Sequence, residues 1–125
     1  MNVPSDLRYT ADHEWVNIDG DIATVGVTDF AQGELGDIVF IEVETEGEEL
    51  DAEDVFGTIE AIKTVADLYI PVSGKVIAIN EELESNPELI NSNPYDKGWV
   101  IKIELNNLSE LDTLLDNNQY EKLIS

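Results

Sequence analysis

The sequence predicts a small, mainly β fold: a β-sandwich or flattened barrel with short peripheral helices and a C-terminal helix. Roughly six or seven short apolar and β-branched runs recur along the chain, and turn-forming residues separate them. There is no long alternation of strands and helices, which disfavours a doubly wound nucleotide-binding fold. A chain of 125 residues is expected to form one domain, residues 1–125, with a core that needs no disulfide bonds.

The N-terminal region contains the clearest hairpin signal. Residues 15–18 and 21–25 are rich in apolar and β-branched side chains, and the Asp-Gly pair between them suits a two-residue type I′ turn. Residues 1–12 show little periodicity. We therefore expect a surface lead-in that Leu7 and Tyr9 anchor.

The next segment is expected to be a short helix followed by a strand. Thr28 can cap the helix, and Gly33 and Gly36 would end it. Residues 37–44 are expected to form the strand. Its stretch 38–41 is continuously apolar, so we expect this stretch to be buried on both faces.

Two apolar segments, residues 55–62 and 64–72, are predicted to form the central hairpin, with Lys63 where they meet. A tight turn usually carries Asn, Asp, Gly or Pro, yet residues 61–66 contain none of these, and Lys63 is their only charge. An apolar tip with a single amine favours recognition by another protein, with the amine as its target. The alternative is a solvated lysine that discourages edge-to-edge pairing of strands.

The C-terminal part combines strands with short helical segments. Residues 76–79 and 99–104 are predicted strands. Between them, residues 80–93 are polar, with apolar side chains spaced for one helical face. A final helix is expected over about 109–124, with an interruption at 117–118.

The charge of the chain restricts its partners. The net charge of −22 comes from 28 acidic and 6 basic residues, which disfavours binding to nucleic acid or to an anionic membrane. The N-terminus lacks the basic and apolar segments of a signal peptide, and no apolar run reaches transmembrane length. We therefore expect a cytoplasmic protein, unless a presequence was removed. The acidic segment 47–54 lacks the ligand spacing of a calcium loop and is predicted to be solvated.

The sequence predicts no catalytic residue and no metal site. His13 is the only histidine, so a site built on two histidines is excluded, and we expect a turn residue or a hydrogen-bonded surface ring. The chain has no glycine-rich phosphate loop, no nucleophile elbow and no cysteine. These observations favour a binding or carrier protein over an enzyme.

The Lys63 hairpin resembles the lipoyl-lysine region of the glycine cleavage system H proteins. That family carries Glu-Ser-Val-Lys-Ala followed by Pro-Val-Ser-Gly, and this chain has Glu-Ala-Ile-Lys-Thr at 60–64 and Pro-Val-Ser-Gly at 71–74. The resemblance continues in order over nearly the whole chain. The further matching blocks are His13–Val16, Thr28–Gln32, Leu35–Phe40, Pro87–Asn91, Pro94–Tyr95, Gly98–Trp99 and Ser109–Tyr120.

The resemblance implies a fold of the lipoyl-domain, or barrel-sandwich hybrid, type with its lipoyl hairpin at about 55–74. It implies lipoic acid as the cofactor, attached through an amide to Lys63, with Glu60 and Gly74 contributing to recognition for lipoylation. From the residues alone, Gly74 lets another backbone approach closely or makes a bend near the tip, and a plain turn is the alternative.

The resemblance also implies a non-catalytic carrier in glycine catabolism and one-carbon metabolism. Such a protein carries an aminomethyl group from glycine decarboxylase (P protein) to aminomethyltransferase (T protein), and dihydrolipoyl dehydrogenase (L protein) reoxidises its dithiol. A lipoate ligase or lipoyl transferase attaches the group. We further expect a monomer, located in the mitochondrial matrix only if a presequence was removed.

A carboxylate near the hairpin is expected to hold the loaded arm, since its amine is cationic at neutral pH. Glu14 and Asp67 are the candidates, because one lies in the His-Glu-Trp block and the other four residues after Lys63. Solvated charges are the alternative reading of both.

Other functions remain open at this point. Biotin domains favour Met-Lys-Met, whereas Ile62 and Thr64 flank Lys63 here, and lipoyl domains of 2-oxoacid dehydrogenases usually have Asp-Lys-Ala and lack the His-Glu-Trp block. A lipoyl donor that serves other lipoate-dependent complexes would need the same lysine. An unmodified acidic interaction module with the same fold is the remaining alternative.

Overall fold

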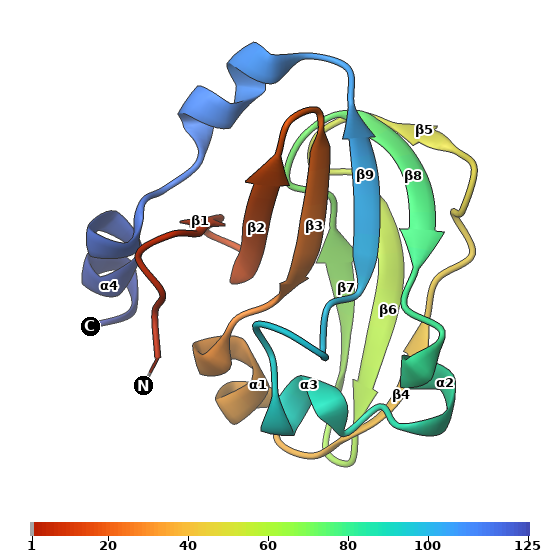
Figure 1. Ribbon diagram of the computed structural model, residues 1–125. Coiled ribbons are helices and arrows are strands. Elements are labelled where there is room, and N and C mark those ends of the chain that lie inside the picture. The colour runs from red at the N-terminus through yellow and green to blue at the C-terminus, as the bar shows by residue number, and fades with distance from the viewer. Residues whose placement is uncertain (1) are drawn as a thin grey trace.

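A computed structural model describes residues 2–125 and shows two antiparallel β-sheets packed face to face (Figure 1). The six-stranded sheet has the order β1-β2-β3-β9-β8-β5, and the three-stranded sheet has the order β4-β6-β7. The strands are β1 (Arg8–Tyr9), β2 (Glu14–Asp19), β3 (Ile22–Val27), β4 (Ile38–Glu42), β5 (Glu49–Leu50), β6 (Val55–Ala61), β7 (Val65–Tyr69), β8 (Gly74–Ile79) and β9 (Ile101–Leu105). The predicted mainly β, sandwich-like fold is confirmed. Within residues 2–125 the two sheets do not join into a closed barrel.

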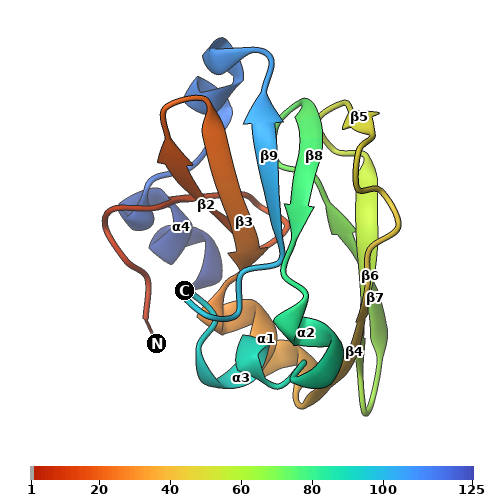
Figure 2. The ribbon, with the colours of Figure 1, turned by 45° about the vertical axis from the view of Figure 1, so that its right-hand side comes forward.

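Short helices surround the two sheets. Figure 2 shows α1, α2 and α3 gathered at one end, with the three-stranded sheet seen nearly edge-on. The helices are α1 (Asp29–Leu35), α2 (Glu82–Ser85), α3 (Leu89–Ser92), the 3₁₀ helix η1 (Leu108–Thr113) and α4 (Asn117–Ile124). No helix in this part of the chain has the length and apolar character needed to cross a bilayer.

The main core lies between the two sheets. Buried side chains of both sheets meet there, such as Val25 and Ile103 from one sheet and Ile59 from the other. A second, smaller apolar cluster lies beside the six-stranded sheet and consists of Leu7, Tyr9, Trp15 and Tyr120. The rings of Tyr9 and Tyr120 stack with their centroids 4.7 Å apart, so this cluster attaches α4 to the start of the chain.

The β2–β3 hairpin is present where it was predicted, but its turn is shifted by one residue. Asp19 pairs with Ile22, so the loop consists of Gly20 and Asp21. Gly20 has a φ of 64°, whereas Asp21 is not among the residues with positive φ. A type I′ turn needs positive φ at both loop positions, and glycine at the first position alone is the pattern of type II′.

Helix α1 begins as predicted and the following strand β4 is present, but the expected burial of this strand on both faces was wrong for Val39 and Phe40. The backbone N–H of Ala31 donates to Thr28 Oγ1 at 3.1 Å, which makes Thr28 the N-cap, and the helix ends at Gly36. In β4, Val39 and Phe40 are about half exposed rather than buried. The pairing with β6 shifts between Ile38 and Phe40, and this bulge turns two consecutive apolar side chains outward.

Two helices, η1 and α4, lie where the sequence predicts a single C-terminal helix. The predicted helix over about 109–124 is interrupted at 114–116, earlier than expected, because Leu115 forms a β-bridge with Tyr9. Asp116 then caps α4 in a reciprocal capping box with Gln119, so the residues expected to break the helix instead begin it.

Candidate functional site

The turn between β6 and β7 carries Lys63 at its apex. The backbone N–H of Ala61 donates to the carbonyl of Thr64 at 2.8 Å and closes the turn. Lys63 is exposed, and its neighbours Ile62 and Val65 are 74% and 61% exposed. The turn projects beyond the helices at the lower end of the molecule in Figure 2. The amine of Lys63 is therefore accessible to a protein partner, and the exposed side chains of Ile62 and Val65 beside it are apolar.

Glu60 lies on the outer face of the three-stranded sheet, next to the turn. Phe40 opposes Glu60 across β4 and β6, and Glu60 opposes Val65 across β6 and β7. All three side chains are exposed. Glu60 and Lys63 are therefore both accessible at this end of the hairpin, and Glu60 has exposed apolar neighbours.

Gly74 lies apart from this surface. It is buried at the start of β8, where it pairs with Leu50 of β5 and Leu105 of β9. A Cβ added at Gly74 would lie 2.5 Å from the carbonyl oxygen of Glu104. The alternative of close backbone approach is the one observed, and the expected bend near the tip is not present. Gly74 is a packing residue beyond the open end of the hairpin.

A pocket of about 410 Å³ opens between β7, α1 and the segment that leads into β2. Its apolar wall includes Val27, Phe30, Leu35, Ile59 and Ala66. Its carboxylates are Asp12, Glu14, Glu34 and Asp67. The structure thus brings Glu14 and Asp67 to one pocket. Glu14 begins β2, whereas Asp67 lies on β7, the strand that continues from the Lys63 turn. An apolar cavity with acidic groups suits a ligand with an alkyl part and a cationic end.

Glu14 is the most deeply buried carboxyl of this pocket, with 2% of its surface exposed. Its Oε1 accepts a hydrogen bond from Thr10 Oγ1 and its Oε2 accepts one from the backbone N–H of Tyr69, both at 3.0 Å. Burial raises the pKa of Glu14 to about 8, and the nearby carboxylates of Asp12 and Glu53 add to this rise. The charged groups that act on Glu14 are thus acidic, and a cation entering the pocket would favour its ionised form.

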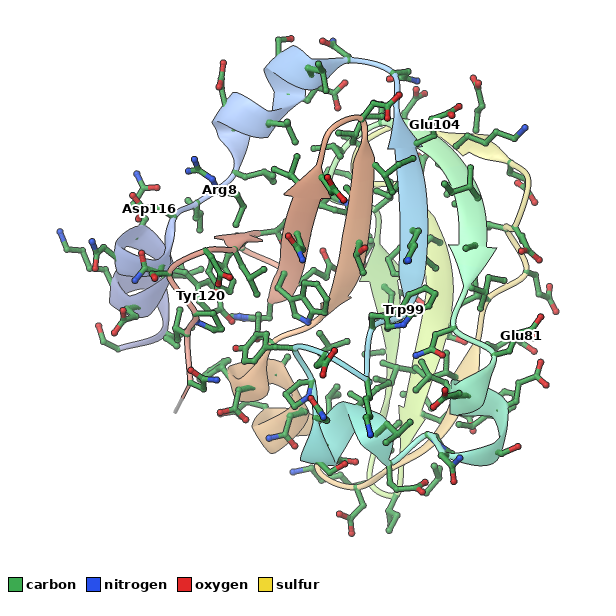
Figure 3. All side chains as sticks on the ribbon, viewed as in Figure 1. Arg8, Glu81, Trp99, Glu104, Asp116 and Tyr120 are labelled. Carbon is green, nitrogen blue, oxygen red and sulfur yellow. The ribbon has the colours of Figure 1, made fainter. Side chains whose placement is uncertain are left out.

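His13 forms part of the pocket wall in a strained backbone conformation, with a φ of 68°. Its Nδ1 lies 2.8 Å from the hydroxyl of Tyr120, and that hydroxyl lies 2.8 Å from Thr28 Oγ1. Figure 3 shows Tyr120 reaching from α4 toward the N-terminal strands. Tyr120, from the C-terminal helix, therefore supports this wall through its contact with His13.

The hydrogen bonds of Thr28 favour one tautomer of His13. Thr28 Oγ1 already accepts the N–H of Ala31 and is fully buried, so its own proton needs an acceptor, and Tyr120 supplies one. Tyr120 then donates to Nδ1 of His13, which leaves the ring proton of the neutral imidazole on Nε2. Burial lowers the pKa of His13, against the opposing effect of Asp12 and Glu34, which favours this neutral form.

Comparison with known proteins assigns the family. The model of the family described as Glycine cleavage H-protein matches residues 7–125. The chain belongs to the glycine cleavage H-protein family. As a member of this family it is a carrier component of the glycine cleavage system.

The relatives of this H-protein-family chain match over its full length. It is 54% identical to the glycine cleavage system H protein of Anoxybacillus flavithermus, over 100% of this chain and 98% of that protein. It is 51% identical to the corresponding protein of Bacteroides fragilis, over 100% and 99%. A crystal structure of a glycine cleavage system H protein from Mycobacterium marinum superimposes with a TM-score of 0.84 at 34% identity, covering 96% of this chain and 97% of that one.

Two pocket features of this H-protein-family chain were not predicted from its sequence. The sequence places Tyr120 in the C-terminal helix, and no local pattern indicates its contact with His13, 107 residues earlier. Phe30 lies in one of the matching blocks, and the sequence does not indicate that its ring packs against that of His13, with centroids 4.9 Å apart. Thr28 was a usable signal for such a contact. A buried capping hydroxyl requires a hydrogen-bond partner, which here is Tyr120.

Proposed function

We propose that Lys63 carries lipoic acid in amide linkage, and that Glu14 and Asp67 contact the loaded arm. The observation that carries this proposal is an exposed amine at a projecting turn, beside a pocket that combines apolar walls with carboxylates. Among the described residues of the hairpin 55–69, Lys63 is the only basic side chain. A ligase therefore meets one target on this surface.

The residues of the site fit a lipoyl group. Phe30, Leu35 and Ile59 offer apolar contacts for an alkyl chain, and the exposed position of Lys63 leaves room for acylation. Bound lipoic acid supplies a disulfide that can be reduced and can carry a one-carbon unit. The chain itself supplies the tether, which raises the local concentration of that unit at each partner enzyme.

As partners we propose the P, T and L proteins of the glycine cleavage system, together with a lipoate ligase or lipoyl transferase. The support is membership of the H-protein family and the exposed apolar surface around Lys63. We propose that the chain acts as a carrier and contributes no catalytic residue of its own. A cytoplasmic location and a monomeric state remain predictions from the sequence.

The test of lipoyl attachment is the intact mass of protein purified from its native host. We expect a lipoyl increment that maps to the peptide containing Lys63. An unmodified mass, in cells that have lipoate and a ligase, would contradict the proposal and favour the acidic interaction module. Genes for P and T proteins in the same genome would favour glycine cleavage over a role as lipoyl donor.

Loss of the pocket carboxylates is expected to shorten the lifetime of the aminomethyl-loaded protein. In Glu14→Ala and Asp67→Ala, the cationic amine loses a charge-assisted contact, so we expect each variant to lose the group several-fold faster, by roughly 3- to 10-fold. The measurement follows the loaded form by mass spectrometry after removal of the P protein. Glu84→Ala, on the exposed face of α2, is the control. If both pocket variants keep the wild-type lifetime, these two contacts are refuted.

A further inference from the structure

Asn91, in α3, joins the two ends of the short loop between α1 and β4. Its Oδ1 accepts the backbone N–H of Ile38 at 2.9 Å, and its Nδ2 donates to the carbonyl of Gly36 at 2.8 Å. The same Nδ2 donates to Gln32 Oε1 at 3.0 Å. Both protons of one amide and its oxygen are therefore used to hold residues 36–38 against α1 and α3.

The loop 36–38 in turn supports the Lys63 turn. The backbone N–H of Ile62 donates to the carbonyl of Asp37 at 3.1 Å. Gly36 has a φ of 83°, a conformation that glycine adopts readily, and a Cβ built there would lie 3.5 Å from Cε of Lys63. The backbone before Lys63 and the stem of its side chain thus both rest on this loop.

The turn has few other contacts that could fix its position. Its residues 62–64 are exposed. In residues 2–125, the hydrogen bond from Ile62 to Asp37 is the one backbone link between residues 62–64 and the protein outside the hairpin. This hydrogen bond therefore couples the loop to the backbone that precedes Lys63.

We propose that Asn91 is a positioning residue for acylation of Lys63, acting through residues 36–38; this inference rests on the proposed lipoyl attachment. In that step the neutral Nζ attacks the carbonyl carbon of an acyl adenylate held by the ligase. The C–N bond forms, the bond from carbon to the phosphate oxygen breaks, AMP leaves, and the surplus proton passes to solvent. Such an attack requires the amine at a defined place and angle relative to the carbonyl.

The test compares Asn91→Ala with Asn80→Ala as a matched control. The Asn80 side chain also makes three hydrogen bonds, to the carbonyls of Lys97 and Trp99 and from the N–H of Glu82. It is 6% exposed, and none of its hydrogen bonds reaches residues 36–38 or 61–66. Both variants lose the same number of bonds, so they separate positioning of Lys63 from general destabilisation.

Unmodified protein is incubated with purified lipoate ligase, ATP and lipoate, at a temperature at which circular dichroism shows every variant folded. For Asn91→Ala we expect kcat for lipoylation to fall by on the order of tenfold or more, because the nucleophile is misplaced. KM should change less than kcat, because every exposed side chain of the docking surface is kept. Asn80→Ala should match the wild type in both constants. The Ile62 amide should exchange with solvent faster in Asn91→Ala than in Asn80→Ala.

A second variant keeps the test decisive if Asn91→Ala folds poorly. Asn91→Asp retains the acceptor for Ile38 but places a carboxylate oxygen against the carbonyl of Gly36, and we expect the same loss in kcat. Wild-type kcat in the folded Asn91 variants, or an equal loss in Asn80→Ala, would overturn the inference while the lipoyl proposal stands. A wild-type protein that takes up no lipoate would overturn the lipoyl proposal itself.

Discussion

Lys63→Arg is expected to abolish attachment of lipoic acid. The substitution keeps the positive charge and nearly the length of the side chain, but a guanidinium stays protonated at every accessible pH and does not attack an activated acyl group. Lys63 is exposed at the turn, so the change should leave the fold intact. After incubation with lipoate ligase, ATP and lipoate, the intact mass should show no lipoyl increment. Glycine cleavage with the partner enzymes should fall to the level measured without this protein.

Lys75→Arg is the control for this experiment. Lys75 is exposed on β8, in the other sheet, and its replacement should leave the mass increment complete. An increment that persists in Lys63→Arg would show that another amine is the acceptor. That result would remove the basis for the carrier proposal.

The second large effect concerns stability and pH, through Glu14. Because burial raises the pKa of Glu14 to about 8 in the folded protein, folding favours its protonated form. The stability that this group contributes is fully present below its unfolded pKa of 4.5 and is lost as the pH rises toward 8. For a group that is 2% exposed, the loss is on the order of 4 to 5 kcal/mol. The free energy of unfolding in urea should therefore fall between pH 5 and pH 8.5.

Glu14→Gln isolates this contribution from that of the other carboxylates. The amide keeps an acceptor for the N–H of Tyr69 and cannot ionise, so the variant should lose much less stability over the same pH range. Glu84→Gln, on an exposed helix face, should behave as the wild type does. Parallel curves for Glu14→Gln and the wild type would show that Glu14 does not titrate in this range.

Local signals in the sequence were sufficient for much of the fold. The cap at Thr28 and the hairpin around Lys63 could be predicted because each depends on residues adjacent in the chain. The exposure of Val39 and Phe40 could not be predicted. An apolar residue type does not indicate whether its side chain points into the core or away from it. A bulge in the pairing with β6 decides which face these two residues occupy.

The candidate site was only partly predictable for a related reason. Glu14 and Asp67 were named from their places in the family pattern and from the charge that the arm carries. The environment of Glu14 depends on the N–H of Tyr69, 55 residues away, which no local pattern signals. The role of Asn91 was equally hidden, because its partners Gly36 and Ile38 lie more than 50 residues earlier.

The contact between His13 and Tyr120 has a consequence during synthesis on the ribosome. His13 is translated 107 residues before its partner, so a nascent chain exposes the pocket wall without its supporting hydroxyl until α4 has left the exit tunnel. Lys63 emerges much earlier, with its hairpin. The turn that carries Lys63 and the completed pocket wall are therefore formed at different stages of synthesis, and the wall gains its supporting hydroxyl last.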